Sequence, residues 1–231
     1  MKVIAFIPAR AGSKGIPNKN LIDVAGKPLI QWTIEAAQKS NKIDTVVVTS
    51  DGDSILDFSK KFKGITILKR PNNLALDNTP TVPVILHAIE ELKISADEYS
   101  HLILLQPTSP LRDDKDIDKA IQSLNNSNAT ALISVVEPNH HPLKSFVKNS
   151  EGFLEGLVNN TYPFTPRQEL PDAYLPNGAI YIVNLKAFKK YKSFFTDKTI
   201  QYIMSVDKSI DVDTTEDIKQ IENQLKYNPL C

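Results

Sequence analysis

The stretch Val3-Ile4-Ala5-Phe6-Ile7 leads directly into the polar residues Pro8-Ala9-Arg10-Ala11-Gly12-Ser13-Lys14-Gly15-Ile16-Pro17-Asn18-Lys19-Asn20-Leu21. The apolar run is typical of a buried strand. In the loop that follows, Gly12 and Gly15 permit close approach of the backbone, and the N–H groups of a turn can form a concave anion site. Arg10, Lys14 and Lys19 add positive charge. The stretch therefore predicts a strand that ends in a polyphosphate-binding loop, and we expect a nucleoside triphosphate as its ligand.

This loop differs from two common phosphate-binding motifs. Gly12-Ser13-Lys14-Gly15 lacks the spacing between Gly and Gly-Lys-Ser/Thr that a P-loop requires. The Gly-x-Gly-x-x-Gly fingerprint of dinucleotide-binding folds is absent from the stretch as well. The alternative is an ordinary connection between a strand and a helix, with scattered surface lysines. The connection ends at Ala25-Gly26-Lys27-Pro28-Leu29-Ile30, where Pro28 suits the first turn of a helix.

The composition is that of a globular protein without an excess of either charge. The chain has 231 residues, of which 41% are hydrophobic and 23% charged, and 27 basic residues balance 27 acidic ones. Balanced charge argues against general binding to nucleic acid or to a membrane surface. No apolar run approaches the length of a membrane span, and residues 3–7 are too short for the core of a signal peptide. The only cysteine, Cys231, argues against a disulfide or a cysteine metal site, so we expect a cytoplasmic protein.

Short apolar runs alternate with helical patterns through residues 1–136. Runs rich in Val, Ile and Leu predict buried strands at 2–7, 44–49, 65–68, 101–106 and 130–136. Apolar residues at helical spacing predict helices around Leu29–Ala37, Ile55–Phe62, Val82–Leu92 and Ile117–Leu124. This alternation is typical of a mainly parallel sheet with helices on both faces. Because ligands of such sheets bind at the carboxyl ends of the strands, we expect the site in loops 8–20, 50–53, 69–79 and 107–113.

The character of the sequence changes after residue 136. Residues 137–176, called the arm below, are rich in proline, at positions 138, 142, 163, 166, 171 and 176. Few helix signals occur there, so we expect a lid, a linker or a subunit-interface segment rather than sheet core. The run Gly178-Ala179-Ile180-Tyr181-Ile182-Val183 returns to the strand pattern. Thr214-Thr215-Glu216-Asp217 is a capping-box arrangement that predicts the start of the last helix.

Asp211-Val212-Asp213 is the second chemically informative motif. In an extended segment residues i and i+2 share a face, so both carboxylates point one way while Val212 faces the core. Two carboxylates on one face suit Mg²⁺, which usually takes one or two of them together with substrate phosphates. The alternative is that Asp213 caps the last helix and Asp211 is solvated.

Several other polar residues follow predicted strands or lie in the arm. Asp51 is a candidate to contact a ribose or a base, although Asp51 or Asp53 could instead cap a helix. Arg70 is a candidate phosphate ligand or a surface charge. Gln106 offers donors and acceptors to a polyhydroxylated ligand, beside the rigid Pro-flanked loop Thr108-Ser109. We expect His140 and His141 to form a turn and not a metal site, so that Lys144 is available to bind a carboxylate. The guanidinium group of Arg167 is suited to bidentate binding of a carboxylate, and the alternative is that Arg167 is a solvated interface residue.

These motifs, in this order, resemble those of the CMP-sialic acid synthetases, also called acylneuraminate cytidylyltransferases. The resemblance covers stretches 7–21, 105–112, 140–144, 166–170, 176–181, 202–205 and 209–214. It implies a three-layer α/β/α fold with a mainly parallel sheet, of the nucleotide-diphospho-sugar transferase type. It also implies a catalytic domain made of residues 1–136 and 177–231, and a small dimerisation segment, 137–176, that reaches into the active site of the neighbouring subunit in a homodimer.

The resemblance implies that CTP and a nine-carbon 2-keto acid sugar react to give a CMP-sugar and pyrophosphate. It also implies Mg²⁺ as the cofactor, for which Mn²⁺ can substitute. The matching nucleotide-binding positions are Arg10, Ala11, Gly12, Ser13, Lys14, Lys19, Asn20 and Arg70. The matching sugar-binding positions are Gln106, Lys144, Arg167, Asn177, Tyr181, Phe194 and Phe195. Asp211 and Asp213 match the metal-binding carboxylates, and Arg10, Lys19 and Asp211 are the candidate catalytic residues. Proton removal from the sugar hydroxyl is assigned either to metal coordination or to Asp211.

The main alternatives concern the sugar. The same reaction on a legionaminate, pseudaminate or Kdo-type sugar fits the motifs, although residues 140–144 and Arg167 favour sialic or legionaminic acid over Kdo. A metal-dependent glycosyltransferase also uses Asp-x-Asp, but there the motif usually follows a strand in mid-sheet, whereas here it precedes the final helix. An inactive binding protein is disfavoured because Lys19, Asp211 and Asp213 are all present. The segment 77–81 diverges from the family pattern, which leaves its contacts open.

Overall fold

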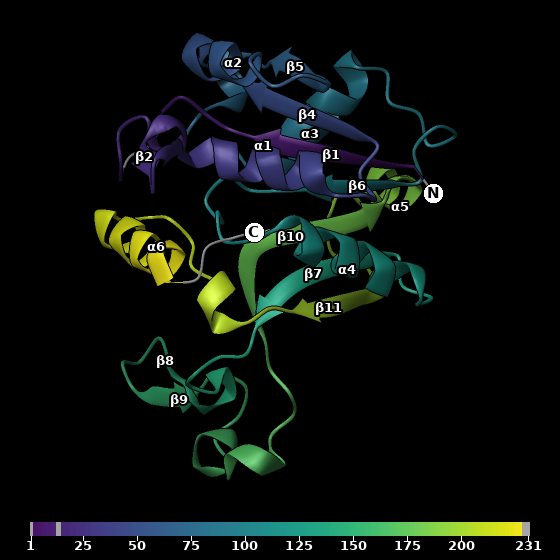
Figure 1. The fold of residues 1–231 in the computed structure, drawn as a ribbon. Coiled ribbons are helices and arrows are strands. Elements are labelled where there is room, and N and C mark those ends of the chain that lie inside the picture. Colours follow the sequence, from purple (N-terminus) through teal and green to yellow (C-terminus); the bar gives the residue numbers. More distant parts are fainter. Residues whose placement is uncertain (1, 13–14, 228–231) are drawn as a thin grey trace.

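A seven-stranded sheet forms the centre of the computed structural model, which describes residues 2–12 and 15–227 (Figure 1). The strand order is β11 (Thr199–Ile203), β7 (Ala131–Val136), β10 (Leu175–Asn184), β6 (His101–Leu104), β1 (Val3–Pro8), β4 (Thr45–Ser50) and β5 (Ile65–Lys69). β10 pairs antiparallel with β6 and β7, and the other neighbours pair in parallel. The mainly parallel sheet is therefore confirmed, with β10 reversed within it.

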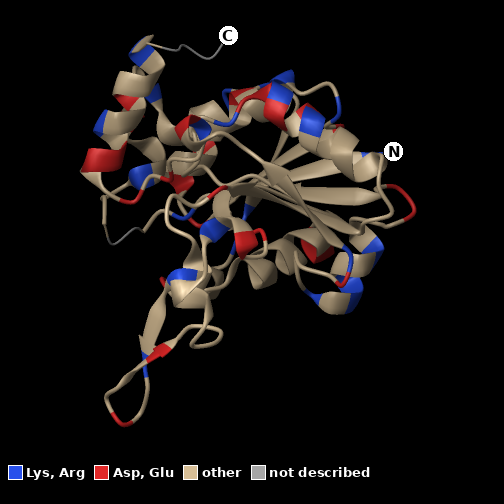
Figure 2. Ribbon diagram, turned by 90° about the horizontal axis from the view of Figure 1, so that it is seen from below, with Lys and Arg blue, Asp and Glu red and all other residues tan. Residues whose placement is uncertain are grey.

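Helices cover both faces of this sheet. Along β1, Val3, Ala5 and Ile7 pack into one apolar core, while Ile4 and Phe6 pack into the other, as the period of a strand requires. The first core also receives α1 (Leu29–Lys39), α2 (Asp53–Ser59) and α4 (Asp114–Asn125). The second receives α3 (Thr81–Glu91) and α5 (Leu185–Tyr191). These layers confirm the predicted α/β/α architecture, and in Figure 2 charged residues lie mostly on the helices and loops outside the sheet.

The last helix forms a separate cluster at one end of the molecule. α6 (Thr215–Tyr227) packs Ile218, Ile221 and Leu225 against residues that include Val24 and Val212. Val24 belongs to a short hairpin of β2 (Asp23–Val24) and β3 (Lys27–Pro28). The predicted capping box is present: the Asp217 carboxylate accepts from Thr214 N at 2.7 Å, and Thr214 Oγ1 accepts from Asp217 N at 3.3 Å. Asp213 therefore precedes the cap and does not form it.

The sequence predicted most elements but missed some short ones. The edge strand β11 was missed because its half-buried residues Thr199-Ile200-Gln201-Tyr202-Ile203 form no continuous apolar run. The seven-residue α5 and the two hairpins were missed because they are short. Pro28 was wrongly placed in a helical turn: its ψ of 138° is extended, and α1 begins at the next residue. Phe62 was wrongly included in a helix, since α2 ends at Ser59, although Phe62 still packs edge-on against Phe58.

The arm leaves the sheet after β7 and projects away from it, as Figure 1 shows. It contains a hairpin of β8 (Phe146–Lys148) and β9 (Leu154–Gly156) and the 3₁₀ helices η3 (Pro142–Lys144), η4 (Tyr162–Phe164) and η5 (Arg167–Glu169). The chain re-enters the sheet at Leu175, two residues before the predicted boundary. Several large apolar side chains of the arm are exposed: Phe146, Phe153, Leu154, Leu157, Val158 and Phe164.

Within the part of the chain that the structure describes, none of the helices combines the length and apolar character needed to cross a membrane.

Candidate functional site

A cavity of about 410 Å³ opens at the carboxyl ends of β1, β5 and β6. Its polar lining includes Arg10, Lys19, Asn20, Arg70, Gln106, Thr108 and Asp213. Arg10, Lys19, Asn20, Arg70 and Thr108 come from loops in which the sequence predicted the site, whereas Gln106 directly precedes one of these loops and Asp213 belongs to the Asp-x-Asp motif. Apolar and hydroxyl side chains from the segment before α3 and from the start of α3 add to the lining: Leu74, Leu76, Thr79, Thr81 and Val84. The cavity thus combines two arginines and a lysine with polar groups and an apolar wall.

Lys19 occupies a junction between the first loop and the Asp-x-Asp segment. It begins the 3₁₀ helix η1 (Lys19–Leu21), and its Nζ donates to Val212 O at 2.6 Å and to Asp213 Oδ1 at 3.0 Å. Its side chain is only 14% exposed. The neighbouring Asn20 is buried and donates from Nδ2 to Arg10 O at 2.9 Å, which braces the loop. Residues separated by more than 190 positions are therefore joined at one edge of the cavity.

Gly15 explains how these two segments come so close. A Cβ at this position would lie 2.9 Å from Asp213 O, so a side chain here would push the Asp-x-Asp segment away. Gly12, by contrast, has no atom within 4 Å of its would-be Cβ. The absence of a side chain at Gly15 thus lets the first loop pack closely against the backbone of Asp213. Ser13 and Lys14, which the resemblance assigned to nucleotide binding, lie outside the described residues.

Asp211 and Asp213 flank Val212, which is completely buried, as the alternation of an extended segment predicts. Asp213 lines the cavity, and its carboxylate pairs with Lys19. Asp211 is exposed but does not line the cavity, and its Oδ1 accepts a long hydrogen bond of 3.5 Å from Ser109 Oγ. Burial is the main cause that raises the pKa of Asp211, and the charge of Asp213 adds to it, while bonds from Thr108 and Ser109 and the charge of Lys19 oppose the rise. The fold thus disfavours the charged form of the Asp211 carboxyl group, although the residue as a whole is exposed.

These two carboxylates are the residues that fit a metal ion. Within residues 2–12 and 15–227, no group of three or more His, Cys, Asp or Glu side chains lies close enough together to hold one. Mg²⁺ needs only one or two carboxylates when substrate phosphates and water complete its shell. The donor set therefore fits a Mg²⁺ ion that binds together with a polyphosphate, and not one held by the protein alone.

Gly178 allows three functional side chains to converge. It has a φ of +76° and lies where the pairing of β10 with β7 is interrupted between Pro176 and Tyr181. Its would-be Cβ lies 3.1 Å from Gln106 Oε1, 3.3 Å from Ser109 Oγ and 3.5 Å from Asp211 Oδ1. Bulges of this kind often occur beside active sites, where they redirect side chains. Sequence reasoning missed this residue, although an isolated glycine within a strand pattern is a signal for a close approach.

Replacing Gly178 by alanine is expected to lower both stability and activity. The left-handed backbone costs alanine about 1–2 kcal/mol, and the methyl group displaces Gln106 and Ser109. Gly64→Ala is the matched control, because Gly64 has the same φ of +76° and no atom within 4 Å of its would-be Cβ. Both variants should lose similar thermal stability in calorimetry, but only Gly178→Ala should lose turnover, by about 10-fold or more. Equal turnover in the two variants would contradict a site role for this convergence.

Arg70 and Asp51 form a buried pair next to the first loop. Arg70 is 5% exposed, and its Nη2 lies 3.4 Å from Asp51 Oδ1, which also accepts from Ala11 N at 3.1 Å. Burial lowers the pKa of Arg70, and the charge of Asp51 opposes that effect. Asp51 therefore positions Ala11 and Arg70 and does not cap α2, whose N-cap residue is Gly52. The surface-charge alternative for Arg70 is wrong, since the residue is buried and lines the cavity.

Arg10 reaches across the cavity to the segment whose contacts the sequence left open. Its Nη1 pairs with Asp77 Oδ1, and Thr79 and Thr81 of the same segment line the cavity. The sequence did not assign these residues, because they depart from the family pattern and lie far from Arg10 in the chain. The pairing shows that the 77–81 segment forms one wall of the site.

The candidate sugar-binding residues are not all at the cavity. Gln106 lines it, whereas Tyr181 packs edge-on against Phe194 with ring centroids 5.9 Å apart, and Phe195 is 66% exposed. Burial raises the pKa of Tyr181, and the charge of Asp211 adds to this, which places the phenol within electrostatic reach of that carboxylate. Asn177 is buried. Its amide donates to Ser209 Oγ at 2.9 Å and accepts from Ser134 Oγ at 2.6 Å, so it braces strands and does not line the cavity.

Lys144 and Arg167 lie in the arm and do not line this cavity. Lys144 is exposed, and Arg167 donates to Pro138 O at 3.1 Å and to Asn139 O at 3.2 Å. The predicted turn at His141 is present, with Nδ1 accepting from Leu143 N at 3.3 Å and Nε2 lying 3.0 Å from Pro171 O. Both basic residues therefore stand on the projecting segment, apart from the cavity of the same chain.

Comparison with known proteins gives a consistent result. The sequence model of a family described as cytidylyltransferase matches residues 4–227. The chain is 32% identical to an N-acylneuraminate cytidylyltransferase of Streptococcus agalactiae serotype V over 99% of this chain and 54% of that protein. It is 30% identical to a pseudaminic acid cytidylyltransferase of Campylobacter jejuni serotype O:2 over 99% of this chain and 98% of that one. The chain thus spans about half the length of the first relative and nearly all of the second.

The fold has solved counterparts too. A CMP:2-keto-3-deoxy-manno-octonic acid synthetase complexed with CTP superimposes with a TM-score of 0.72, at 18% identity, over 98% of this chain and 99% of that one. At this identity the likeness establishes the fold.

Proposed function

The chain belongs to the cytidylyltransferase family, and from that premise we propose that it transfers CMP from CTP to the anomeric hydroxyl of a nine-carbon acid sugar. The observation that carries the proposal is the junction at Lys19, where the basic first loop meets the Asp-x-Asp segment beside Gln106 and Thr108. In this cavity, Arg10, Lys19 and Arg70 could bind the phosphates of a triphosphate, and Gln106 could form hydrogen bonds with a hydroxylated acceptor. Relatives that act on neuraminate and pseudaminate support the class of acceptor.

The chemistry requires positioning and charge stabilisation more than covalent catalysis. The oxygen of the sugar hydroxyl forms a bond to the α-phosphorus of CTP, the bond between that phosphorus and the bridging oxygen to the β-phosphate breaks, and pyrophosphate leaves. Lys19 stabilises the negative charge that develops on the α-phosphate or on the leaving pyrophosphate. Arg10 and Arg70 hold the remaining phosphates.

The hydroxyl must also lose its proton. Asp211 is one candidate acceptor, because the fold raises its pKa, mainly by burial, and this makes it a stronger base than an ordinary aspartate; coordination of the hydroxyl to a metal is the other. Asp211 and Asp213 would hold Mg²⁺, or Mn²⁺ in its place, which when bound neutralises phosphate charge and acidifies a coordinated hydroxyl. Thr108 and Ser109 keep the Asp211 carboxylate in place through their hydroxyl groups.

The test is pyrophosphate release with CTP, Mg²⁺ and a panel of acid sugars: N-acetylneuraminate, legionaminate, pseudaminate and Kdo. We expect release with one of the first three, lost when the metal is chelated. Release with Kdo alone would correct the class of sugar. Absence of CTP binding in calorimetry would contradict the proposal as a whole. The cytoplasmic location expected from the sequence stays a prediction.

The arm suggests how the sugar end of the site is completed. It carries exposed apolar side chains, of which Phe153, Leu154 and Phe164 are 67%, 72% and 80% exposed. Exposed apolar clusters of this kind often mark protein interfaces. We therefore propose a homodimer in which the arm of one subunit covers the cavity of the other, and in which Lys144 and Arg167 bind the sugar carboxylate in trans. Charge recognition of a carboxylate by an arginine fork fits this role.

Subunit complementation tests this arrangement. Lys19→Ala and Arg167→Ala subunits should each be inactive as homodimers. After mixing and subunit exchange, half of the dimers are mixed and one of their two sites contains both intact residues, so about a quarter of the wild-type activity should return. Exchange is monitored by native mass spectrometry of differently tagged subunits. No recovery after confirmed exchange would place Arg167 in the site of its own subunit or outside the site.

A further inference from the structure

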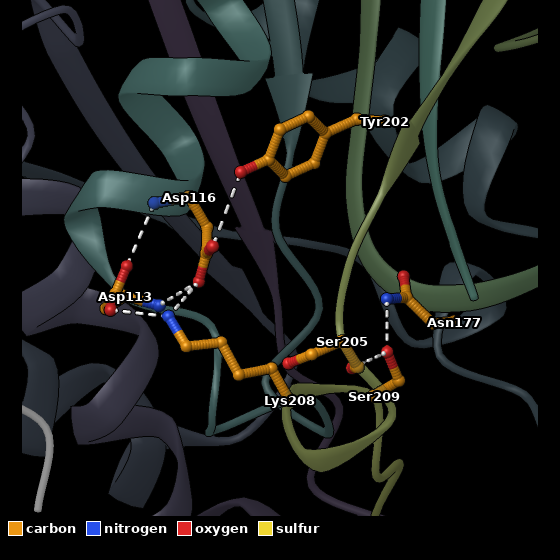
Figure 3. A network of polar contacts seen from close by, with 7 residues as sticks. All are labelled: Asp113, Asp116, Asn177, Tyr202, Ser205, Lys208 and Ser209. Carbon is orange, nitrogen blue, oxygen red and sulfur yellow. Dashed lines mark hydrogen bonds and ion pairs between the residues drawn. The ribbon is translucent and has the colours of Figure 1, made fainter. Parts of the chain in front are cut away.

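A cluster of charged residues outside the cavity joins α4 to the segment that carries the candidate metal ligands (Figure 3). Lys208 Nζ lies 2.6 Å from Asp113 Oδ2 and 2.7 Å from Asp116 Oδ2. Tyr202 of β11 donates its hydroxyl to Asp116 Oδ1 at 3.4 Å. We call these four residues the Lys208 cluster. None of them lines the cavity, so the cluster takes no direct part in binding a substrate there.

The two carboxylates of the cluster have little freedom. Asp113 is the N-cap of α4 and accepts from Asp116 N at 2.9 Å, while Asp116 accepts from Asp113 N at 3.2 Å. This is a capping box in which both side chains are acidic, so the carboxylates repel each other unless a cation lies between them. Lys208 supplies that cation. The ion pairs raise the pKa of Lys208 although burial opposes the rise, and hydrogen bonds and charge from Lys208 lower the pKa of Asp113 against its burial.

Lys208 lies three residues before Asp211. It ends the 3₁₀ helix η6 (Val206–Lys208), which connects β11 to the Asp-x-Asp segment. The next residue, Ser209, donates to Ser205 O at 2.8 Å and accepts from Asn177 Nδ2 at 2.9 Å, as Figure 3 shows. On the other side of Asp211, Val212 N donates to Thr108 O at 2.8 Å. Asp211 therefore lies between two points at which the chain is held by polar contacts, here called fixed points: residues 208–209 and Val212.

Each of the two fixed points has a contact with loop 106–113, and the one at residues 208–209 is also bonded to Asp116 of α4 and Asn177 of β10. Thr108, which holds Val212, and Asp113, which holds Lys208, lie five positions apart in the sequence. Between them Arg112 is fully buried, with Nη1 donating to Ala179 O at 3.1 Å and to Gln106 O at 3.4 Å. Its Nε and Nη2 have no hydrogen-bond partner among the described residues, but Asp116 and Asp113 lie close enough to stabilise its charge. The loop is thus a rigid base against which the segment 208–212 is tied twice.

We propose that Lys208 is a positioning residue: its double ion pair with Asp113 and Asp116 holds residues 205–213 against the N-terminus of α4 and so fixes the direction of the Asp211 carboxylate. This inference rests on the proposed function for the role of Asp211. Removing Lys208 removes the ion pairs from one of the two fixed points and leaves it only the hydrogen bonds of Ser209, so the carboxylate then samples orientations that do not suit a metal bound together with CTP. Mutation of a residue that orients a metal ligand without touching the metal typically lowers metal affinity or activity by about 10- to 100-fold.

The test compares Lys208→Met with Lys219→Met. Methionine keeps the length and the apolar stem of lysine and removes the charge. Lys219 is a matched control, because it forms a 3.2 Å ion pair with Glu216 on the nearby α6 and is 67% exposed. Calorimetric titration of Mg²⁺ into protein saturated with CTP is the main readout, with pyrophosphate release as the second. We expect Lys208→Met to weaken Mg²⁺ binding by about 10-fold or more, Lys219→Met to leave it unchanged, and Lys208→Arg to restore most of it.

A charge-balanced double variant separates positioning from stability. Asp116→Asn with Lys208→Met removes one carboxylate together with the cation, so the repulsion in the capping box disappears. We expect its thermal midpoint to approach that of the wild type while its Mg²⁺ affinity stays low. Wild-type Mg²⁺ affinity in Lys208→Met, or in the double variant, would overturn the proposal. Because binding is measured directly, the result stands apart from the sugar panel: inactive wild type with normal Mg²⁺ and CTP binding would count against the proposed function alone.

Discussion

Lys19→Met should abolish most of the turnover while the protein remains folded. The Lys19 side chain is 14% exposed, and its ammonium group is the cation that joins Val212 O and Asp213 at the edge of the cavity. In the proposed reaction it stabilises charge that develops during bond cleavage, and removal of one such donor typically costs about 10²- to 10³-fold in kcat. Pyrophosphate release at saturating CTP measures the loss, and circular dichroism checks the fold. Arginine should rescue little, because its planar fork cannot replace a compact point charge in this position.

A second lysine provides the control for this prediction. Lys27 pairs with Glu35 at 2.7 Å and lies over the ring of Trp32, outside the cavity. Lys27→Met therefore loses a comparable ion pair without touching the site, and its turnover should stay within about two-fold of the wild type. If Lys19→Met kept turnover at the level of Lys27→Met, the proposed role of the first loop would be wrong.

Asp211→Asn should combine a large loss of activity with unchanged or greater thermal stability. Asparagine keeps the shape of the side chain but can neither hold a metal as a carboxylate nor accept the hydroxyl proton, so turnover should fall by about 10²- to 10⁴-fold. The expected thermal stability of this variant follows from the direction of the pKa shift of Asp211. The fold raises the pKa of Asp211 above its unfolded value, mainly by burial. A raised pKa means that the folded protein favours the neutral form of the group, so replacement by the neutral amide should not lower the free energy of unfolding.

The measurement pairs calorimetric unfolding without metal at pH 7 with pyrophosphate release. Asp207→Asn is the matched control, because Asp207 is an exposed residue of η6 in the same segment. It should leave both quantities unchanged. A marked fall in the unfolding midpoint of Asp211→Asn would show that its carboxylate stabilises the fold, which would contradict the direction of the pKa. Activity near that of the wild type would remove Asp211 from the candidate catalytic residues.

The sequence predicted the layers and the first loop because these depend on local patterns. Continuous apolar runs identified β1, β4 and β7, and the position of polar residues after those runs indicated the edge of the sheet that carries the cavity. The capping box at Thr214 and Asp217 was predicted by its spacing alone. Short elements such as β11 lacked such patterns, because an edge strand with one half-buried face shows little hydrophobic contrast.

The contacts that complete the site could not be predicted, because they join distant residues. The pairs of Arg10 with Asp77 and of Lys208 with Asp113 connect segments 67 and 95 positions apart. Asn177 illustrates the limit of resemblance: its position matched a sugar-binding residue, but its amide is buried and bonded to Ser134 and Ser209. A motif identifies the residue type at a position, whereas the direction of the side chain depends on neighbours that only the folded chain brings together.

The reversal of β10 has an evolutionary consequence. Because β10 runs against β7, the end of β7 and the start of β10 lie at the same edge of the sheet, with Val136 paired to Leu175. The arm therefore leaves and re-enters the fold at adjacent points of the same sheet edge. An insertion at such a point can change length and composition without altering any strand of the sheet. The arm can therefore be remodelled or exchanged without altering the sheet, and under the sugar-binding role proposed for Lys144 and Arg167 such changes would alter the acceptor preference.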